Sequence, residues 1–276
     1  MHKRPGRKHK LLWWLGGAAV AVVLVAVGGP FAYIHFIEGP PPAALALPAG
    51  GSGSADAATS SKGSGVAGTW HVGTGSLSGY RVSEVLLGQN TTAVGRTSDL
   101  SGSVTISGTT VTSGSFTVAM ATVKSDQSQR NAQFNSARIM DTTTYPTATL
   151  VLTKPIPLGA VPAVGSVHRY PASGRLTMHG VTRAVSFTVE ATRTAAGVDV
   201  LADIPITFSD WHIANPSIGG FVTTADTGTL ETLLVLTTGA GNSSAAGQTT
   251  STTTPAPSAP VTVPSTTTPA LKIAGS

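Results

Sequence analysis

The chain of 276 residues contains no cysteine, so it has no disulfide framework, no thiolate metal site and no cysteine for N-terminal acylation. Only 11% of its residues are charged. Serine-hydrolase elbows, paired-histidine zinc motifs, phosphate-binding loops and glycine-rich dinucleotide fingerprints are also missing from the sequence. The fold must therefore be stabilised by packing, and we expect a protein that is not an enzyme and needs no cofactor.

The net charge of +5 does not belong to a basic surface. Five positive side chains lie within residues 1–10 with no acid among them, and from residue 11 onward the 12 basic and 12 acidic side chains cancel. A nucleic-acid binder needs its positive charge on the folded surface, where it meets phosphates. We therefore expect no nucleic-acid partner.

Residues 11–37 contain no Asp, Glu, Lys or Arg. A helix of this length is long enough to cross the hydrocarbon layer of a bilayer, and Trp13 and Trp14 lie at one end of it, where aromatic rings prefer the interface. Because positive charge stays on the cytoplasmic side, the sequence predicts a single-pass membrane protein with residues 1–10 as a cytoplasmic head. Everything after Glu38 is then extracytoplasmic.

A cleaved signal peptide is the alternative, because Ala44-Leu45-Ala46 has the small residues of a cleavage site. The apolar run is longer than a signal core and ends well before that site, which favours the anchor. Residues 38–66 are rich in Pro, Gly and Ser and predict a flexible linker, and residues 239–276 predict a disordered tail rich in Ser, Thr, Pro and Ala. Glycosylation of the tail is left open.

The folded domain is expected over residues 67–238, where apolar residues alternate with polar ones. The pattern is clearest from Val198 to Phe208, in which every second residue is apolar while Asp199 and Asp203 fall on the other face. About eight such strands, with one short helix near 126–137, predict an all-β, antiparallel barrel. An eight-stranded barrel has room inside for side chains or one slender ligand.

Several stretches together resemble the YceI-like family of polyisoprenoid-binding, lipocalin-like proteins of the bacterial cell envelope. The similarity covers most of residues 67–238, and its most specific part is the stretch from Gly174 to Val185. The other residues that carry it are Gly68-Thr69-Trp70, Ser78-Gly79-Tyr80-Arg81-Val82, Arg130-Asn131, Phe134, Tyr145-Pro146, Ile206 to Trp211, Val222 and Asp226.

The resemblance implies a lipocalin-like barrel whose hydrophobic pore holds a long isoprenoid chain or a quinone-like ligand. The chain departs from the family in its anchor and tail, since family members are commonly soluble and secreted. It also departs at Asn131, where an acid is expected beside the arginine. These departures affect the expected ligand more than the expected fold.

A binding tunnel would be lined by inward-facing residues of the strands. The candidates are Phe116, Val118, Met120, Phe187 and Val189. The alternative is that the same residues fill a solid barrel, because periodicity identifies the inner face and does not tell whether it is hollow. A solid barrel would make the protein a non-catalytic envelope interaction or stress-related module.

Charged and polar candidates are fewer. Arg130, in the helical stretch before Phe134, could meet a ligand head group with bidentate bonds, but an ion pair with Asp126, four residues earlier, is the favoured interpretation. His179 next to Gly180 is interpreted as a turn residue and not as a metal ligand. Ser209, Asp210 and His212 do not form a triad if they lie on a strand, because neighbouring strand residues alternate faces.

Overall fold

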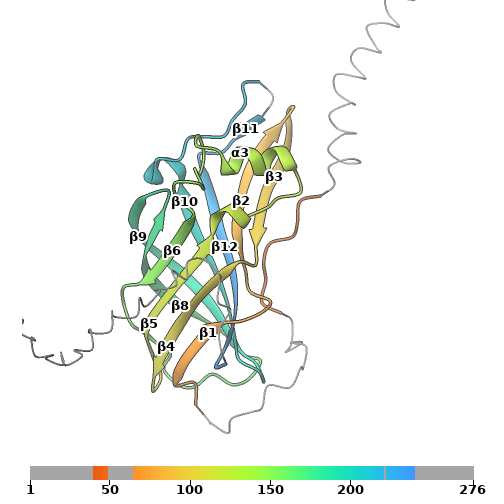
Figure 1. Ribbon diagram of the computed structural model, residues 1–276. Helices are drawn as coiled ribbons and strands as arrows, with labels where there is room; N and C mark the ends of the chain where they lie inside the picture. Colours follow the sequence, from red (N-terminus) through yellow and green to blue (C-terminus); the bar gives the residue numbers. More distant parts are fainter. Residues whose placement is uncertain (1–39, 49–64, 221, 240–276) are drawn as a thin grey trace, which may run out of the picture. The chain divides into compact units, whose positions relative to one another are not determined.

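The computed structural model describes residues 40–48, 65–220 and 222–239 (Figure 1). All the strands in this part of the chain belong to one antiparallel sheet. They are β1 (Gly68–Val72), β2 (Leu77–Leu86), β3 (Gln89–Thr97), β4 (Leu100–Ser107), β5 (Thr110–Ala119), β6 (Thr147–Leu152), β7 (Ile156–Pro157), β8 (Val167–Met178), β9 (Val181–Arg193), β10 (Val198–Thr207), β11 (Val222–Thr224) and β12 (Thr227–Thr237).

The sheet closes on itself through the order β1-β4-β5-β6-β8-β9-β10-β12, with β12 pairing back to β1 at His71↔Thr237 and Val72↔Leu236. The first half of β12 pairs instead with β2, which carries β3 and β11. The ring confirms the expected antiparallel barrel of eight strands. Closure leaves the ring strands without a free edge, which removes the aggregation hazard of an open sheet.

The alternation along β10 confirms the expected inner face. Ala202, Ile204 and Ile206 are buried in the hydrophobic core, whereas Asp203 is exposed on the outer face. The stretch that carries the most specific resemblance forms the β8–β9 hairpin, whose turn is made by His179 and Gly180, both with positive φ. Period-two patterning thus explains both the ring and the direction in which its side chains point.

The α3 helix (Ser128–Asn135) lies at one end of the barrel, beside β2, β3 and β11 (Figure 1). Gln133 Nε2 donates to the carbonyl of Pro216 at 3.0 Å, which brings the loop before β11 to the same end. We call this end, made by α3, the β2–β3 turn at Leu87 and Gly88, and residues 213–218, the helix end. The β9–β10 turn lies at the other end, where β10 begins opposite Leu236.

One predicted strand segment is wrong. Phe208–Trp211 forms the 3-10 helix η4, and His212 ends it with φ +57°. The turn buries Trp211, whose indole donates to the carbonyl of Leu176 at 3.4 Å. Ser209, Asp210 and His212 therefore do not alternate between two faces as strand residues would.

The predicted cytoplasmic head, the membrane segment 11–37 and the tail from residue 240 lie outside the described residues. Within the described ranges, no helix is long and apolar enough to cross a membrane. The predicted linker 38–66 is described over 40–48 and 65–66, and the first of these segments contacts the barrel: Arg81 Nη2 donates to the carbonyl of Pro42 at 2.8 Å.

Candidate binding cavity

The barrel is hollow. A cavity of about 280 Å³ runs inside it, lined mostly by apolar side chains of the ring strands. Inward-facing residues such as Phe116, Val118 and Val189 are only half-buried, because they pack against the core on one side and border this space on the other. A cavity of this size and lining suits a slender apolar ligand.

Every residue predicted to bind a ligand lies on the cavity wall. They are Phe116, Val118, Met120, Arg130, Phe134, Phe187 and Val189. The apolar members come from β5, η3 (Met120–Thr122), α3 and β9, so the fold brings together residues that are far apart in the sequence. That these residues bind a ligand stays a prediction.

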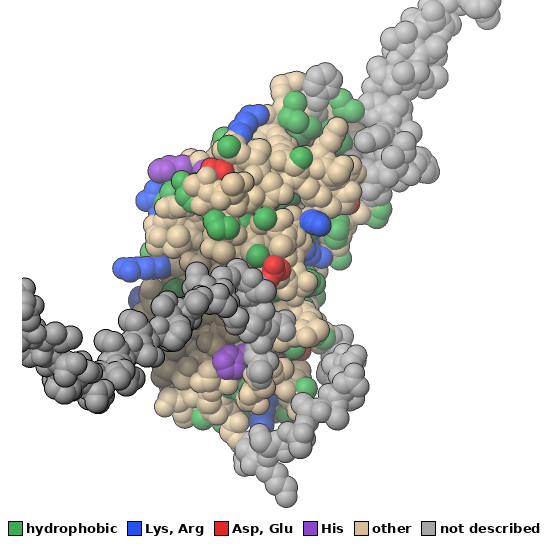
Figure 2. All heavy atoms as spheres, in the orientation of Figure 1, with side chains coloured by type: hydrophobic (Ala, Val, Ile, Leu, Met, Phe, Trp, Pro, Cys, Tyr) green, Lys and Arg blue, Asp and Glu red, His purple; other side chains and the backbone are tan. Residues whose placement is uncertain are grey.

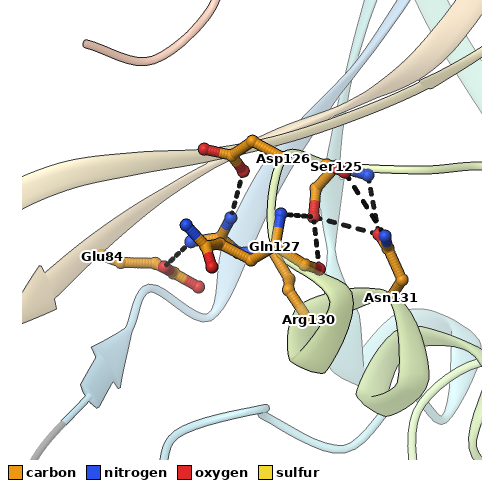
Figure 3. A network of polar contacts seen from close by, with 6 residues as sticks. All are labelled: Glu84, Ser125, Asp126, Gln127, Arg130 and Asn131. Atoms are coloured by element: carbon orange, nitrogen blue, oxygen red, sulfur yellow. Dashed lines mark hydrogen bonds and ion pairs between the residues drawn. The ribbon is translucent and has the colours of Figure 1, made fainter. Parts of the chain in front are cut away.

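Arg130 forms the predicted ion pair and a second one. Its Nη1 lies 2.7 Å from Asp126 Oδ1, and its Nη2 lies 3.5 Å from Glu84 Oε2 on β2 (Figure 3). Glu84 also lines the cavity and its side chain is 12% exposed. The two acids neutralise the guanidinium charge at the helix end of the cavity. The sequence analysis missed Glu84, although it follows Tyr80 and Val82 at period two on the inner face of β2.

Asn131 closes the loop that leads into α3. Its Oδ1 accepts hydrogen bonds from the backbone N–H of Ser125 at 2.7 Å and from the Ser125 hydroxyl at 3.0 Å (Figure 3). Its Nδ2 donates to the Ser125 carbonyl at 3.3 Å. A carboxylate at this position could accept the first two bonds but could not donate the third. The asparagine therefore closes this loop with three hydrogen bonds to Ser125.

Tyr80 is another polar residue at the helix end of the cavity. Burial raises the pKa of Tyr80 to about 12, and Glu84 and Asp126 add to the rise while Arg130 opposes it. The phenol is therefore neutral over the physiological range and is a hydrogen-bond donor at the cavity wall.

Among the other polar residues of the cavity wall, Thr224 and Tyr170 differ from the rest, and the sequence analysis missed both. The hydroxyls of Thr224 and Tyr170 are shielded from solvent and have no hydrogen-bond partner among the described residues. Burial raises the pKa of Tyr170, which keeps its hydroxyl protonated. An unpaired buried hydroxyl is costly, so each of these groups is a point at which a polar atom of a ligand would be stabilised.

The remaining candidates have structural contacts. His179 lies in the β8–β9 turn as predicted, with Nδ1 3.0 Å from the carbonyl oxygen of Trp211 and its ring edge-on to Tyr145. No group of three or more His, Asp or Glu side chains in the described part of the chain could hold a metal ion.

A closed antiparallel barrel around an apolar cavity, with a few polar groups on its wall, defines a small barrel that has room for one slender ligand. The chain belongs to the YceI-like family, because the model of the YceI-like domain matches residues 70–236.

Solved structures with a similar fold include a polyisoprenoid binding domain from Saccharophagus degradans, with 17% identity and a TM-score of 0.49 over 61% of this chain and 97% of that one. BcnA of Burkholderia cenocepacia has 23% identity and a TM-score of 0.45 over 56% and 94% of the two chains. The YceI protein of Campylobacter jejuni has 16% identity and a TM-score of 0.38 over 49% and 80%. Among curated proteins, none matches the chain significantly.

Proposed function

We propose that this protein is a membrane-anchored component of the cell envelope that holds a long-chain isoprenoid, or a similar amphiphilic lipid, inside its barrel. The observation that carries the proposal is the apolar cavity of about 280 Å³ within a YceI-like barrel. A barrel that served only as an interaction module would have no need of an internal space.

The lining suits a hydrocarbon chain because it is apolar along the length of the barrel. Side chains of β5, β9 and β10, among them Val118, Phe187 and Val200, surround the space. Each ligand CH₂ transferred from water into such a lining contributes roughly 0.8 kcal/mol, so a few isoprene units provide most of the affinity.

The helix end of the cavity favours a neutral head group. Arg130 is already paired with Glu84 and Asp126, so a diphosphate would have to displace two carboxylates or lie beside them. A quinone or alcohol oxygen needs only a hydrogen-bond partner, and the Thr224 hydroxyl is free of one among the described residues. We therefore favour a quinone-like or prenol ligand over a phosphorylated one.

Residues 11–37 are the proposed anchor, with the barrel outside the cytoplasm. Their uncharged length and the basic head before them support this topology. Binding without catalysis fits a family defined by a ligand-holding barrel and a wall whose polar groups lie at its ends.

The decisive experiment is extraction of the purified full-length protein with organic solvent, followed by mass spectrometry of the extract. We expect an isoprenoid in stoichiometric amount, and saturable rebinding of a prenylated quinone to the emptied protein. A folded protein with no extracted lipid, and no binding of prenylated quinones or prenols, would overturn the proposal and favour an interaction module.

A further inference from the structure

Glu231 is a buried acid on the outside of the barrel. Its neighbours Leu230 and Thr232 line the cavity, so the side chain of Glu231 points outward, yet this side chain is only 4% exposed. Two arginines pair with it: Arg81 Nε lies 2.5 Å from Oε1, and Arg96 Nη2 lies 3.0 Å from Oε2. An outward carboxylate this deeply buried must be covered by something on the barrel surface.

Part of that cover is the segment of residues 40–48, which we call the strap. Arg81 donates to the carbonyl of Pro42, and Arg96 donates to the carbonyl of Ala43. Each arginine therefore joins Glu231 on one side and the strap backbone on the other. Leu45 and Leu47 of the strap are half-buried, whereas the residues on either side of each are exposed. The contact combines charge-assisted hydrogen bonds with alternate apolar packing.

The order of these contacts gives the strap a direction. In the β2–β3 pair, Arg81 lies opposite Val94 and Arg96 lies opposite Gly79, so Arg96 is the farther of the two from the turn at Leu87. Passing from Pro42 to Ala43 therefore leads away from the helix end. The chain before Pro42 runs toward the helix end, and the prolines at 40, 41 and 42 are stiff enough to continue in that direction without reversing.

Chain length then limits where the membrane lies. From Ile37, the last residue of the proposed anchor, to Pro42 an extended chain spans at most about 18 Å. From Arg81 to Leu87 the strand β2 extends roughly 20 Å toward the helix end. The β2–β3 turn therefore reaches the level at which the anchor leaves the bilayer.

We infer that the strap holds the barrel with its helix end against the membrane surface, so that the cavity exchanges its ligand directly with the bilayer. This inference rests on the anchoring part of the proposed function. The occupant of the helix-end surface is the lipid bilayer itself.

Exposed apolar side chains at the helix end agree with this orientation. Leu87 is 42% exposed and Ile218 is 49% exposed, and both lie where β2 and β11 meet. Figure 2 shows hydrophobic side chains at this upper end of the barrel. Val164 and Val167 are as exposed at the opposite end. Exposure alone therefore does not identify the end of the barrel that faces the membrane, whereas the direction of the strap does.

The orientation has a chemical consequence for the ligand. A long isoprenoid is too apolar to cross water freely, since every CH₂ exposed to water is unfavourable. With the helix end at the bilayer, the groups around Tyr80 and Arg130 lie at the level of the lipid head groups. A ligand head could remain at that level while its chain moves between the bilayer and the cavity.

The absence of native cysteine makes the test direct. Full-length protein in lipid vesicles is labelled with a fluorophore either at Asn90→Cys, near the β2–β3 turn, or at Ala196→Cys, in the β9–β10 turn. Both positions are exposed. A quencher attached to lipid head groups should quench the label at residue 90 several-fold more than the label at residue 196. Equal quenching, or stronger quenching at residue 196, would overturn the inference.

A pair of insertions isolates the strap. About twelve Gly and Ser residues inserted between Gly39 and Pro40 add roughly 20 Å of reach and should abolish the difference between the two labels. The same insertion between Gly50 and Gly51 lies after the strap and should leave the difference unchanged. An equal effect of both insertions would show that the strap does not set the orientation. Neither insertion alters the barrel, so both variants should fold.

Failure of the inference and failure of the proposed function are distinguishable. If the extract contains lipid but the two labels are quenched equally, the lipid-binding function stands and the proposed orientation is wrong. A mature protein that begins at Leu47 by intact mass and is released without detergent would remove both the anchor and the first half of the strap. If the label at residue 90 is quenched more strongly but the extract contains no lipid, the orientation stands and the lipid-binding function is wrong.

Discussion

Tyr80 stacks on Phe134, with ring centroids 5.2 Å apart and planes inclined by 15°. The contact joins β2 of the barrel to α3 and lies on the wall of the cavity. The stack therefore packs the buried ring of Tyr80 directly against the helix.

The buried Tyr80 predicts a loss of stability at alkaline pH. Its pKa rises from 10.0 to about 12 in the folded protein, so the folded state holds the proton more tightly than the unfolded chain does. The stabilisation from this group is complete below about pH 10 and is lost as the pH rises through about 12. We expect the free energy of unfolding to fall over this window, and to fall less in Tyr80→Phe. Denaturant unfolding at a series of pH values measures the difference, and equal slopes for the two proteins would contradict it.

The buried Glu231 predicts a larger stability effect than an acid of the same sheet whose arginine partner is exposed. Glu231→Gln leaves Arg81 and Arg96 without their charged partner, and we expect a loss of about 1 to 3 kcal/mol in the free energy of unfolding. Glu190→Gln is the matched control, because its partner Arg169 has a side chain that is 73% exposed. The control should change stability by less than about 1 kcal/mol. Equal losses in both variants would show that the outer network adds nothing beyond an ordinary surface pair.

Asn131 predicts a difference between two small substitutions. Asn131→Ala removes all three contacts with Ser125 and should lower the free energy of unfolding by about 1 to 3 kcal/mol. Asn131→Asp keeps the two accepted bonds and should lose less. Thermal unfolding of the two variants beside Asn135→Ala, whose side chain accepts a single bond from Thr142, checks the order. A greater loss for Asn131→Asp than for Asn131→Ala would contradict the assigned contacts.

Much of the barrel could be predicted because strand periodicity needs no knowledge of distant contacts. The alternation from Val198 to Ile206 identifies the inner face wherever the strand lies in the sheet. At Phe208 the same alternation predicts a strand where a 3-10 turn forms, because this turn buries Trp211 through a contact with Leu176 that the local pattern does not contain. The α3 helix was expected over 126–137 and is found over Ser128–Asn135.

In the candidate site, too, some contacts can be predicted from the local sequence and others cannot. Asp126 and Arg130 are four residues apart on the chain, and the ion pair predicted from that spacing forms although Asp126 lies before the first residue of α3. Glu84 reaches Arg130 from another element, and no local pattern predicts that contact. Nor does periodicity tell a hollow barrel from a solid one, because inward side chains of the same type occur in both. That distinction depends on how far apart the opposite walls lie.

Val189→Phe tests directly whether the cavity holds the ligand. Val189 lies on the cavity wall and is half-buried, so a larger side chain can extend into empty space. In a solid barrel the added ring would overpack the core and cost about 1 to 3 kcal/mol. In the hollow barrel we expect the free energy of unfolding of the emptied protein to stay within about 0.5 kcal/mol of the parent, while the affinity for a prenylated quinone falls at least tenfold.

The matched control is Thr188→Phe, the next residue along β9, which is exposed on the outer face and should leave affinity unchanged. Denaturant unfolding and ligand titration of both variants separate the two effects. Because Val189→Phe adds volume without adding charge, a fall in affinity at unchanged stability would mean that the ring occupies the space of the ligand. Unchanged affinity in a stable Val189→Phe protein would show that the ligand lies elsewhere, and a marked loss of stability would show that the wall at Val189 is already packed.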